Sequence, residues 1–258
     1  MNYEKELAIA KRVAREAGAI MRQYFRGDQQ RIVKEDGTPL TIADTSINRL
    51  VIERLEELFP DDGIIGEEES TSEYGMGRVW FCDPIDGTKA FTWGVPTAMF
   101  SLGLVVDGAP VLGVCYEPML DQLYWAVKGG GAYCNDQKLA VSQSDLSDGI
   151  VAISSSPRDY QGDSVMATLL ETGITNAVFS GAVYKASAVA DGRFVGYVET
   201  KVNAHDMAAV QVIVEEAGGR VTDLNGKDYD YSRPFRGTLV SNGVVHEELL
   251  KITMKGKA

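Results

Sequence analysis

The sequence has 258 residues, of which 45% are hydrophobic, and its formal net charge is −12. Such a chain can bury a sizeable core, so we expect a single domain over residues 1–258 with halves at about 1–145 and 146–258. The acidic charge disfavours a nucleic-acid or acidic-membrane partner, because those surfaces attract clustered lysine and arginine. No apolar run reaches about 18 residues and Met1–Glu6 is charged, so we expect neither a signal peptide nor a membrane span.

The cysteines indicate the redox environment. Cys82, Cys115 and Cys134 are odd in number and widely spaced. This pattern favours reduced core thiols over a disulfide framework or a zinc site. We therefore expect a cytoplasmic protein.

The first half begins with two amphipathic helices. Apolar residues recur at helical spacing over 3–25 and again over 42–59. The intervening segment 28–39 is polar and contains glycine and proline, which predicts a mobile loop or a short hairpin. From 97 to 140 the pattern changes to short apolar strands, and Asp107-Gly108 is typical of a hairpin turn between two of them.

The second half alternates strands with helices. We expect helices at 163–171, 182–190, 206–217 and 247–253, and strands near 177 and at 193–199. After a largely antiparallel first half, this alternation predicts a layered α/β arrangement. The glycines Gly129–Gly131 lack the following Lys-Ser/Thr and helix of a phosphate loop, so we interpret them as a tight bend.

The segment Asp83-Pro84-Ile85-Asp86-Gly87-Thr88 places two carboxylates close together in the sequence. It follows an apolar strand and its proline cannot pair in a sheet, so we expect Asp83 and Asp86 to project from a turn after Cys82. The backbone amides of Gly87 and Thr88 would then be free to meet an anion. By itself, the pattern is more typical of a structural turn.

Two other acidic positions add to this pair. Glu67 begins a triple acidic run directly after a short apolar strand, where like charges repel unless a cation lies among them. Asp206 lies in the first turn of a predicted helix. Taken alone, the acidic run is typical of a solvated loop, and Asp206 is typical of a helix N-terminus. Converging carboxylates suit Mg²⁺, and a chain with only two histidines is a poor candidate for zinc.

In this order, the segments resemble the inositol monophosphatase family of metal-dependent phosphatases. The resemblance covers nearly the whole chain and rests on the elements Lys34-x-Asp36-Gly37-Thr38-Pro39-x-Thr41-x-Ala43-Asp44, Gly66-Glu67-Glu68, Asp83-Pro84-Ile85-Asp86-Gly87-Thr88 and His205-Asp206-Met207-Ala208-Ala209. It implies a five-layer αβαβα sandwich, two to three Mg²⁺ ions per active site, lithium sensitivity and a homodimer. His205 departs from the Trp that this family usually carries before its metal-binding Asp.

The resemblance also implies a set of metal ligands. Glu67, Asp83 and the carbonyl of Ile85 would bind a first metal, and Asp83, Asp86 and Asp206 a second. A third, weaker metal would share Glu67 beside a water molecule. His205 is left outside the catalytic set, because a lone histidine is more often structural.

The catalytic roles are carried over in the same way. Asp44 and Thr88, together with Glu67, are implied to polarise the nucleophilic water. The amides of Gly87 and Thr88 are implied to hold phosphate oxygens. Hydrolysis of a phosphate monoester needs an activated water, neutralised phosphoryl charge and help for the leaving alkoxide, and bound metals supply all three.

The resemblance implies substrate contacts when the sequence is aligned with the family on Asp206 without gaps. Ser180, Gly181 and Ala182 fall on the family's small-residue loop near the inositol ring, and Glu199 falls on the carboxylate that accepts ring hydroxyls. Lys185 lies one helical turn further. It resembles a residue of the bisphosphate nucleotide phosphatases, or it is a solvated helix residue.

We therefore expect an Mg²⁺-dependent phosphomonoesterase acting on myo-inositol monophosphate. Histidinol phosphate is the first alternative, because a carboxylate at Glu199 suits an ammonium group as well as a polyol, although Ala182 stands where that branch tends to have Asp. A 3′(2′),5′-bisphosphate nucleotidase and a fructose-1,6-bisphosphatase are further alternatives. A metal-binding regulatory module is the non-enzymatic alternative.

Overall fold

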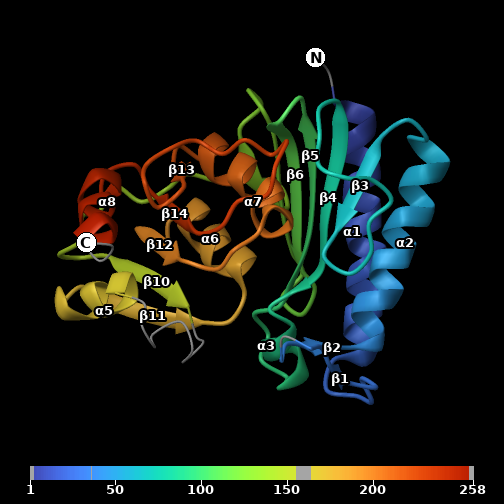
Figure 1. Cartoon of the computed structure of the whole chain (residues 1–258), viewed down its shortest axis with the longest axis horizontal. Helices are drawn as coiled ribbons and strands as arrows, with labels where there is room; N and C mark the ends of the chain where they lie inside the picture. The colour runs from blue at the N-terminus through green and yellow to red at the C-terminus, as the bar shows by residue number, and fades with distance from the viewer. Residues whose placement is uncertain (1–2, 36, 155–163, 256–258) are drawn as a thin grey trace.

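The computed structural model describes residues 3–35, 37–154 and 164–255. Its layers in Figure 1 are α1 (Glu4–Tyr24) with α2 (Ile42–Leu58), a large sheet, α6 (Ala182–Ala190) with α7 (Ala204–Glu216), a second sheet, and α5 (Ser164–Glu171) with α8 (His246–Lys255). This is the expected five-layer αβαβα sandwich. Asp36 of the first sequence element and the expected helix start at 163 lie outside the described residues.

The outer helices α1 and α2 confirm the helices expected at 3–25 and 42–59. Thr41 caps α2, because its hydroxyl oxygen accepts from the amide of Ala43 and its own amide donates to the carboxylate of Asp44. A reciprocal cap of this kind stabilises a helix by about 1 kcal/mol. Between the helices, β1 (Ile32–Val33) and β2 (Pro39–Leu40) form the predicted antiparallel hairpin.

The large sheet has seven strands in the order β3-β4-β5-β6-β7-β8-β9. They are β3 (Gly63–Gly66), β4 (Arg78–Asp86), β5 (Met99–Val106), β6 (Ala109–Glu117), β7 (Gln122–Val127), β8 (Ala132–Cys134) and β9 (Gln137–Lys138). Only the β3–β4 pair among these neighbours is parallel. The predicted turn at Asp107-Gly108 joins β5 to β6, and its positive φ angles of 50° and 77° suit a tight hairpin.

The second sheet has five strands in the order β11-β10-β12-β14-β13. They are β10 (Ile150–Ser154), β11 (Thr175–Phe179), β12 (Gly196–Glu199), β13 (Arg220–Thr222) and β14 (Thr238–Ser241). The expected strands near 177 and at 193–199 are therefore present as β11 and β12. β12 begins at Gly196, three residues later than expected, and Phe194 donates its amide to Ala188 of α6 at 2.8 Å.

Helix α7 lies between the two sheets and packs very closely on the first one. A Cβ atom at Gly113 of β6 would meet the carbonyl oxygen of Ala209 at 2.0 Å, and one at Gly103 of β5 would meet the amide nitrogen of Ala209 at 2.6 Å. These paired glycines therefore let the backbone of α7 approach the sheet directly. The close contact fixes the position of the first turn of α7, where Asp206 lies.

The remaining expectations concern single features. Gly129 and Gly131 donate their amides to the carboxylate of Glu216, both at 2.7 Å, so this bend binds an anion of its own chain and the structural interpretation holds. Cys82, Cys115 and Cys134 are free thiols. Among the described helices, none combines the length and apolar character needed to cross a membrane. The single domain over 1–258 stays a prediction, because it concerns cooperative unfolding and not geometry.

Candidate active site

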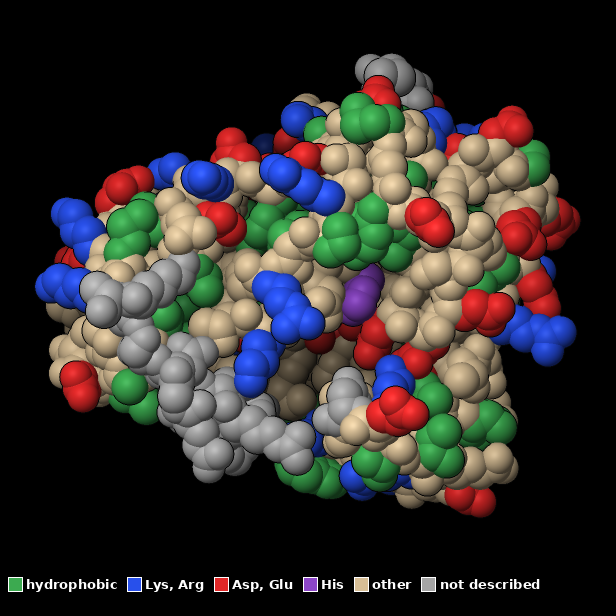
Figure 2. All heavy atoms as spheres, in the orientation of Figure 1, with side chains coloured by type: hydrophobic (Ala, Val, Ile, Leu, Met, Phe, Trp, Pro, Cys, Tyr) green, Lys and Arg blue, Asp and Glu red, His purple; other side chains and the backbone are tan. Residues whose placement is uncertain are grey.

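A cavity of about 380 Å³ opens between the end of β4, the first turns of α6 and α7, and the ends of strands β10 to β12. Figure 2, in the orientation of Figure 1, shows a hollow near the centre of the molecular surface, bordered by both basic and acidic side chains. Its lining includes Thr38, Glu67, Asp86, Gly87, Thr88, Lys89, Ser180, Gly181, Ala182, Lys185, Glu199, Lys201 and Asp206. Of the site residues expected from the sequence, Asp44, Asp83 and Ile85 are not part of this lining, and the others are.

Strand β4 carries the carboxylates of Asp83 and Asp86, one on each side of a β-bulge. Asp83 pairs with Ser101 and Asp86 pairs with Met99, and the register shifts between them. The expectation that the strand ends at Cys82 and that both Asp residues project from a turn is therefore wrong. The proline interrupts the ladder, as expected, but pairing with β5 resumes at Asp86.

Asp86 connects the first sheet to α6. Its carboxylate accepts hydrogen bonds from the amides of Ala182 at 2.9 Å and Val183 at 2.8 Å, which are free donors of the first helical turn. Gly181, with φ of 96°, makes room for this contact, since a Cβ atom there would lie 2.9 Å from Asp86 Oδ2. Burial nevertheless raises the pKa of Asp86 to about 7, with a further contribution from the charge of Asp206.

Three buried carboxylates converge beside the cavity, and two of them, Asp86 and Asp206, line it. One oxygen each of Asp83, Asp86 and Asp206 lies within 4.8 Å of the other two. Burial and mutual repulsion raise the pKa of Asp83 well above its usual value, and burial also raises the pKa of Asp206. Buried oxygen donors at these separations, destabilised by their own charge, fit a hard divalent cation.

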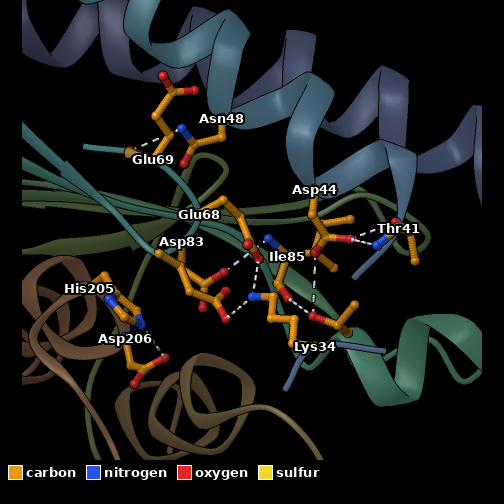
Figure 3. A network of polar contacts seen from close by, with 12 residues as sticks. Lys34, Thr41, Asp44, Asn48, Glu68, Glu69, Asp83, Ile85, His205 and Asp206 are labelled. Carbon is orange, nitrogen blue, oxygen red and sulfur yellow. Dashed lines mark hydrogen bonds and ion pairs between the residues drawn. The ribbon is translucent and has the colours of Figure 1, made fainter. Parts of the chain in front are cut away.

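Glu67 lies at the outer side of this group. Lys34, from the loop before α2, places its ammonium nitrogen 3.3 Å from Glu67 and 2.6 Å from Glu68 (Figure 3). Glu68 therefore holds Lys34 beside the cluster, and Glu67 retains an oxygen for the cavity. Glu69, the third member of the acidic run, is exposed.

Asp44 and Thr88 meet at the start of the short helix α3 (Thr88–Thr92). The hydroxyl of Thr88 lies 3.4 Å from Asp44 Oδ1 and 3.0 Å from the carbonyl oxygen of Ile85. The other oxygen of Asp44 accepts from the hydroxyl and amide of Thr41, so the carboxylate is held in place. Burial raises the pKa of Asp44 to about 6.

The opposite wall carries the expected substrate residues. Lys185 of α6 is buried and places its ammonium nitrogen 2.5 Å from Glu199 Oε2 at the end of β12. Tyr197 donates its hydroxyl hydrogen to the same oxygen at 2.5 Å. Lys185 is therefore not a solvated helix residue, and Glu199 is already paired before any substrate arrives.

Comparison with known proteins decides the family. A sequence profile of the inositol monophosphatase family matches residues 2–257. The chain belongs to the inositol monophosphatase family. A solved structure of a Thermotoga maritima IMPase superimposes with a TM-score of 0.88 at 29% identity and covers 98% of both chains.

Curated relatives carry several names. A fructose-1,6-bisphosphatase/inositol-1-monophosphatase of Thermotoga maritima is 34% identical over 83% of this chain and 81% of its own length. A histidinol-phosphatase of Chlorobaculum parvum is 36% identical over 86% of this chain and 87% of its own length. Membership of the inositol monophosphatase family makes the chain a phosphoric monoester hydrolase of a metal-dependent family, as expected from the sequence.

Two residues of this family member were missed from the sequence. Tyr197 lies on the same face of β12 as Glu199, and the two-residue spacing was the available signal. His205 lies in the first turn of α7, directly before Asp206, and a ring nitrogen of His205 lies within 4.8 Å of carboxylate oxygens of Glu67 and Asp83. Its place directly before Asp206 was the available signal, but His205 was left outside the catalytic set because a lone histidine is more often structural.

Proposed function

We propose that the chain hydrolyses myo-inositol monophosphate with Mg²⁺ as its cation. The observation that carries this proposal is the convergence of Asp83, Asp86 and Asp206 beside a cavity of about 380 Å³ that Asp86 and Asp206 line. All-oxygen ligands suit Mg²⁺, and a cavity of this volume suits a small phosphorylated polyol.

The chain's own groups have distinct parts in the proposed reaction. Bound Mg²⁺ would supply a water of lowered pKa and neutralise charge on the phosphoryl group and the leaving oxygen. Thr88, whose hydroxyl can donate to Asp44 or to the carbonyl of Ile85, would accept a hydrogen bond from the attacking water. Glu67 would orient that water from the other side. The amides of Gly87 and Thr88 would hold phosphate oxygens.

The paired state of Glu199 supports a polyol. The positive charge of Lys185 offsets the negative charge of Glu199, so Glu199 attracts a substrate ammonium group only weakly. The second oxygen of Glu199 can still accept a hydrogen bond from a substrate hydroxyl. Ser180 and Ala182 border the same space without adding charge. Inositol phosphate is therefore favoured over histidinol phosphate, which carries an ammonium group.

A second candidate is fructose 1,6-bisphosphate. Lys89 and Lys201 line the cavity in addition to the paired Lys185, and cations around a site favour a substrate with a second phosphate. The name of the Thermotoga maritima relative includes this activity. A bisphosphorylated nucleotide would be favoured by the same lysines.

A substrate panel tests these assignments. Phosphate release would be measured with Mg²⁺ from inositol 1-phosphate, histidinol phosphate, fructose 1,6-bisphosphate and 3′-phosphoadenosine 5′-phosphate, with Asp83→Asn protein as the blank. We expect the highest kcat/KM for inositol 1-phosphate. A higher value for another ester would replace the inositol assignment by that ester, and no metal-dependent release from any of them would favour a regulatory module.

Three further properties belong to the proposal. Lithium should inhibit, because Asp83, Asp86 and Asp206 are all present at the implied second metal position, and inhibition should be uncompetitive with substrate. Full activity in millimolar lithium would contradict this.

We also propose a homodimer, to be measured by sedimentation, and a cytoplasmic location, which the free cysteines support.

A further inference from the structure

His205 faces the carboxylates of the cavity from the first turn of α7. Its side chain is 14% exposed, and its Nε2 atom lies 3.8 Å from Asp206 Oδ1. A ring nitrogen of His205 and one carboxylate oxygen each of Glu67 and Asp83 lie within 4.8 Å of one another. Figure 3 shows His205 and Asp206 together on one side of Asp83.

These separations match those between ligands of one metal ion. Ligand atoms that each lie about 2.0–2.3 Å from a shared ion are at most about 4.6 Å apart. A bound ion would therefore require shifts of only a few tenths of an ångström, which side-chain rotations of Glu67 and His205 can supply. Lys34 can remain on Glu68, its nearer partner, while Glu67 turns toward the ion.

The imidazole of His205 is also available as a ligand. Among the described residues, none forms a hydrogen bond with its ring nitrogens, and the distance to Asp206 exceeds that of a hydrogen bond. The chain's other histidine is different, because the ring of His246 is engaged by Thr222 at 3.1 Å and by Ser241 at 2.8 Å. His246 is also buried in α8.

A nitrogen donor changes which cation the site prefers. Mg²⁺ binds oxygen ligands almost exclusively, whereas imidazole suits the divalent first-row transition metals. We propose that His205 is a nitrogen ligand of the cation held by Glu67 and Asp83, and that this position takes a divalent transition metal in preference to Mg²⁺. The proposal rests on the proposed function only in that Asp83 also belongs to the carboxylates proposed there to hold Mg²⁺.

Manganese is the probe, because Mn²⁺ is paramagnetic and reports its ligands directly. One equivalent of Mn²⁺ would be added to the full chain and examined by pulsed EPR for nuclear modulation from nitrogen. We expect nitrogen modulation in the wild-type protein, and we expect it to change when the histidines are labelled with ¹⁵N. This measurement needs no substitution, so it does not depend on the folding of a variant.

Two variants then assign the nitrogen. His205→Phe should abolish the modulation and weaken Mn²⁺ binding by about tenfold or more, since loss of even an indirect ligand partner costs that much. Mg²⁺ binding, read by competition, should be unchanged. His246→Gln is the matched control and should keep both the modulation and the Mn²⁺ affinity.

The outcomes separate this inference from the proposed function. Bound Mn²⁺ without histidine modulation, modulation that persists in His205→Phe, or equal loss of Mn²⁺ and Mg²⁺ binding in that variant would overturn it. Phosphate release with Mg²⁺ is read independently on the substrate panel. Histidine ligation without any phosphate release would leave the inference standing and remove the proposed function.

Discussion

The ammonium nitrogen of Lys185 lies 2.5 Å from Oε2 of Glu199, and the side chain of Lys185 is only 2% exposed. A buried ion pair in the wall of a substrate cavity fixes the charge that a substrate meets there. It also costs free energy if one partner is removed, because the other is left buried and unpaired. Substrate preference and local stability are therefore linked at this pair.

Lys185→Met should move substrate preference toward histidinol phosphate. Without the ammonium group, Glu199 regains a full charge that can pair with the ammonium group of the substrate. We expect the ratio of kcat/KM for histidinol phosphate to that for inositol 1-phosphate to rise by about tenfold, the scale of one charge-assisted hydrogen bond.

Lys89→Met is the matched control for this ratio. It removes the same charge from the cavity lining and leaves the pair of Lys185 with Glu199 intact. Its ratio should equal that of the wild-type protein. An unchanged ratio in Lys185→Met, or an equal change in both variants, would show that the paired state of Glu199 does not set the preference.

Asp83→Asn should abolish phosphate release and leave the metal-free protein as stable as the wild type or more stable. Asp83 is a buried charge repelled by Glu67 and Asp86, so its neutralisation relieves unfavourable energy. The Asn side chain can still accept the hydrogen bond from the amide of Ile85. The measurements are phosphate release with Mg²⁺ and the thermal midpoint in a chelator.

Asp62→Asn is the control for Asp83→Asn, because Asp62 is a carboxylate in a stabilising ion pair and not one among like charges. Asp62 is paired with Arg78 at 2.8 Å, accepts from the indole of Trp80 at 2.9 Å and is not among the residues that line the cavity. This variant should lose stability and keep its activity. If Asp83→Asn instead loses stability and keeps activity, the carboxylate has a structural role and is no metal ligand.

The sequence predicted the elements that carry these residues better than it predicted their contacts. The helical period places Asp206 in the first turn of α7, and the structure has it there. The bulge that holds Asp83 and Asp86 was not predictable, because the proline indicates a break in pairing but not that β5 pairs again with Asp86. Local patterns report local geometry, and the bulge depends on a partner strand.

The contact between Lys185 and Glu199 shows the same limit. One residue lies in α6 and the other at the end of β12, so their separation depends on how the helix packs against the second sheet. The motif comparison assigned Glu199 to the substrate without its buried partner. His205 was likewise judged by its neighbours in sequence, although its neighbours in space are Glu67 and Asp83.

Thr88→Ala should lower kcat by about a hundredfold with little change in KM, the scale of lost general-base assistance. The Thr88 hydroxyl contacts both Asp44 and the carbonyl of Ile85, so it is held where it can orient water. Thr88→Ser is the matched control, because it keeps the hydroxyl and should keep most of kcat. A raised KM with normal kcat in the alanine variant would assign Thr88 to substrate binding.

The stability of the metal-free protein should fall as pH rises from about 4 to about 7. Burial raises the pKa of Asp44 from 3.8 to about 6 and that of Asp86 from 3.8 to about 7. In this window the folded state therefore binds more protons than the unfolded state, and the stability that these groups contribute is lost as pH passes their folded pKa. His246 acts in the opposite direction, because burial lowers its pKa from 6.5 to about 4, so its contribution increases with pH.

The comparison of Asp86→Asn with the wild-type protein isolates the contribution of the Asp86 carboxylate to the pH dependence of stability, because His246 is present in both proteins. The substitution weakens the hydrogen bonds to Ala182 and Val183 at every pH, so only the slope is informative. We expect the wild-type thermal midpoint in a chelator to fall relative to the variant between pH 5 and pH 8. Because a divalent ion needs ionised carboxylates, the increase in midpoint on adding Mg²⁺ to the wild type should be larger at pH 8 than at pH 5. Parallel curves for the two proteins, or an equal effect of Mg²⁺ at both pH values, would contradict the protonation of Asp86 in the metal-free fold.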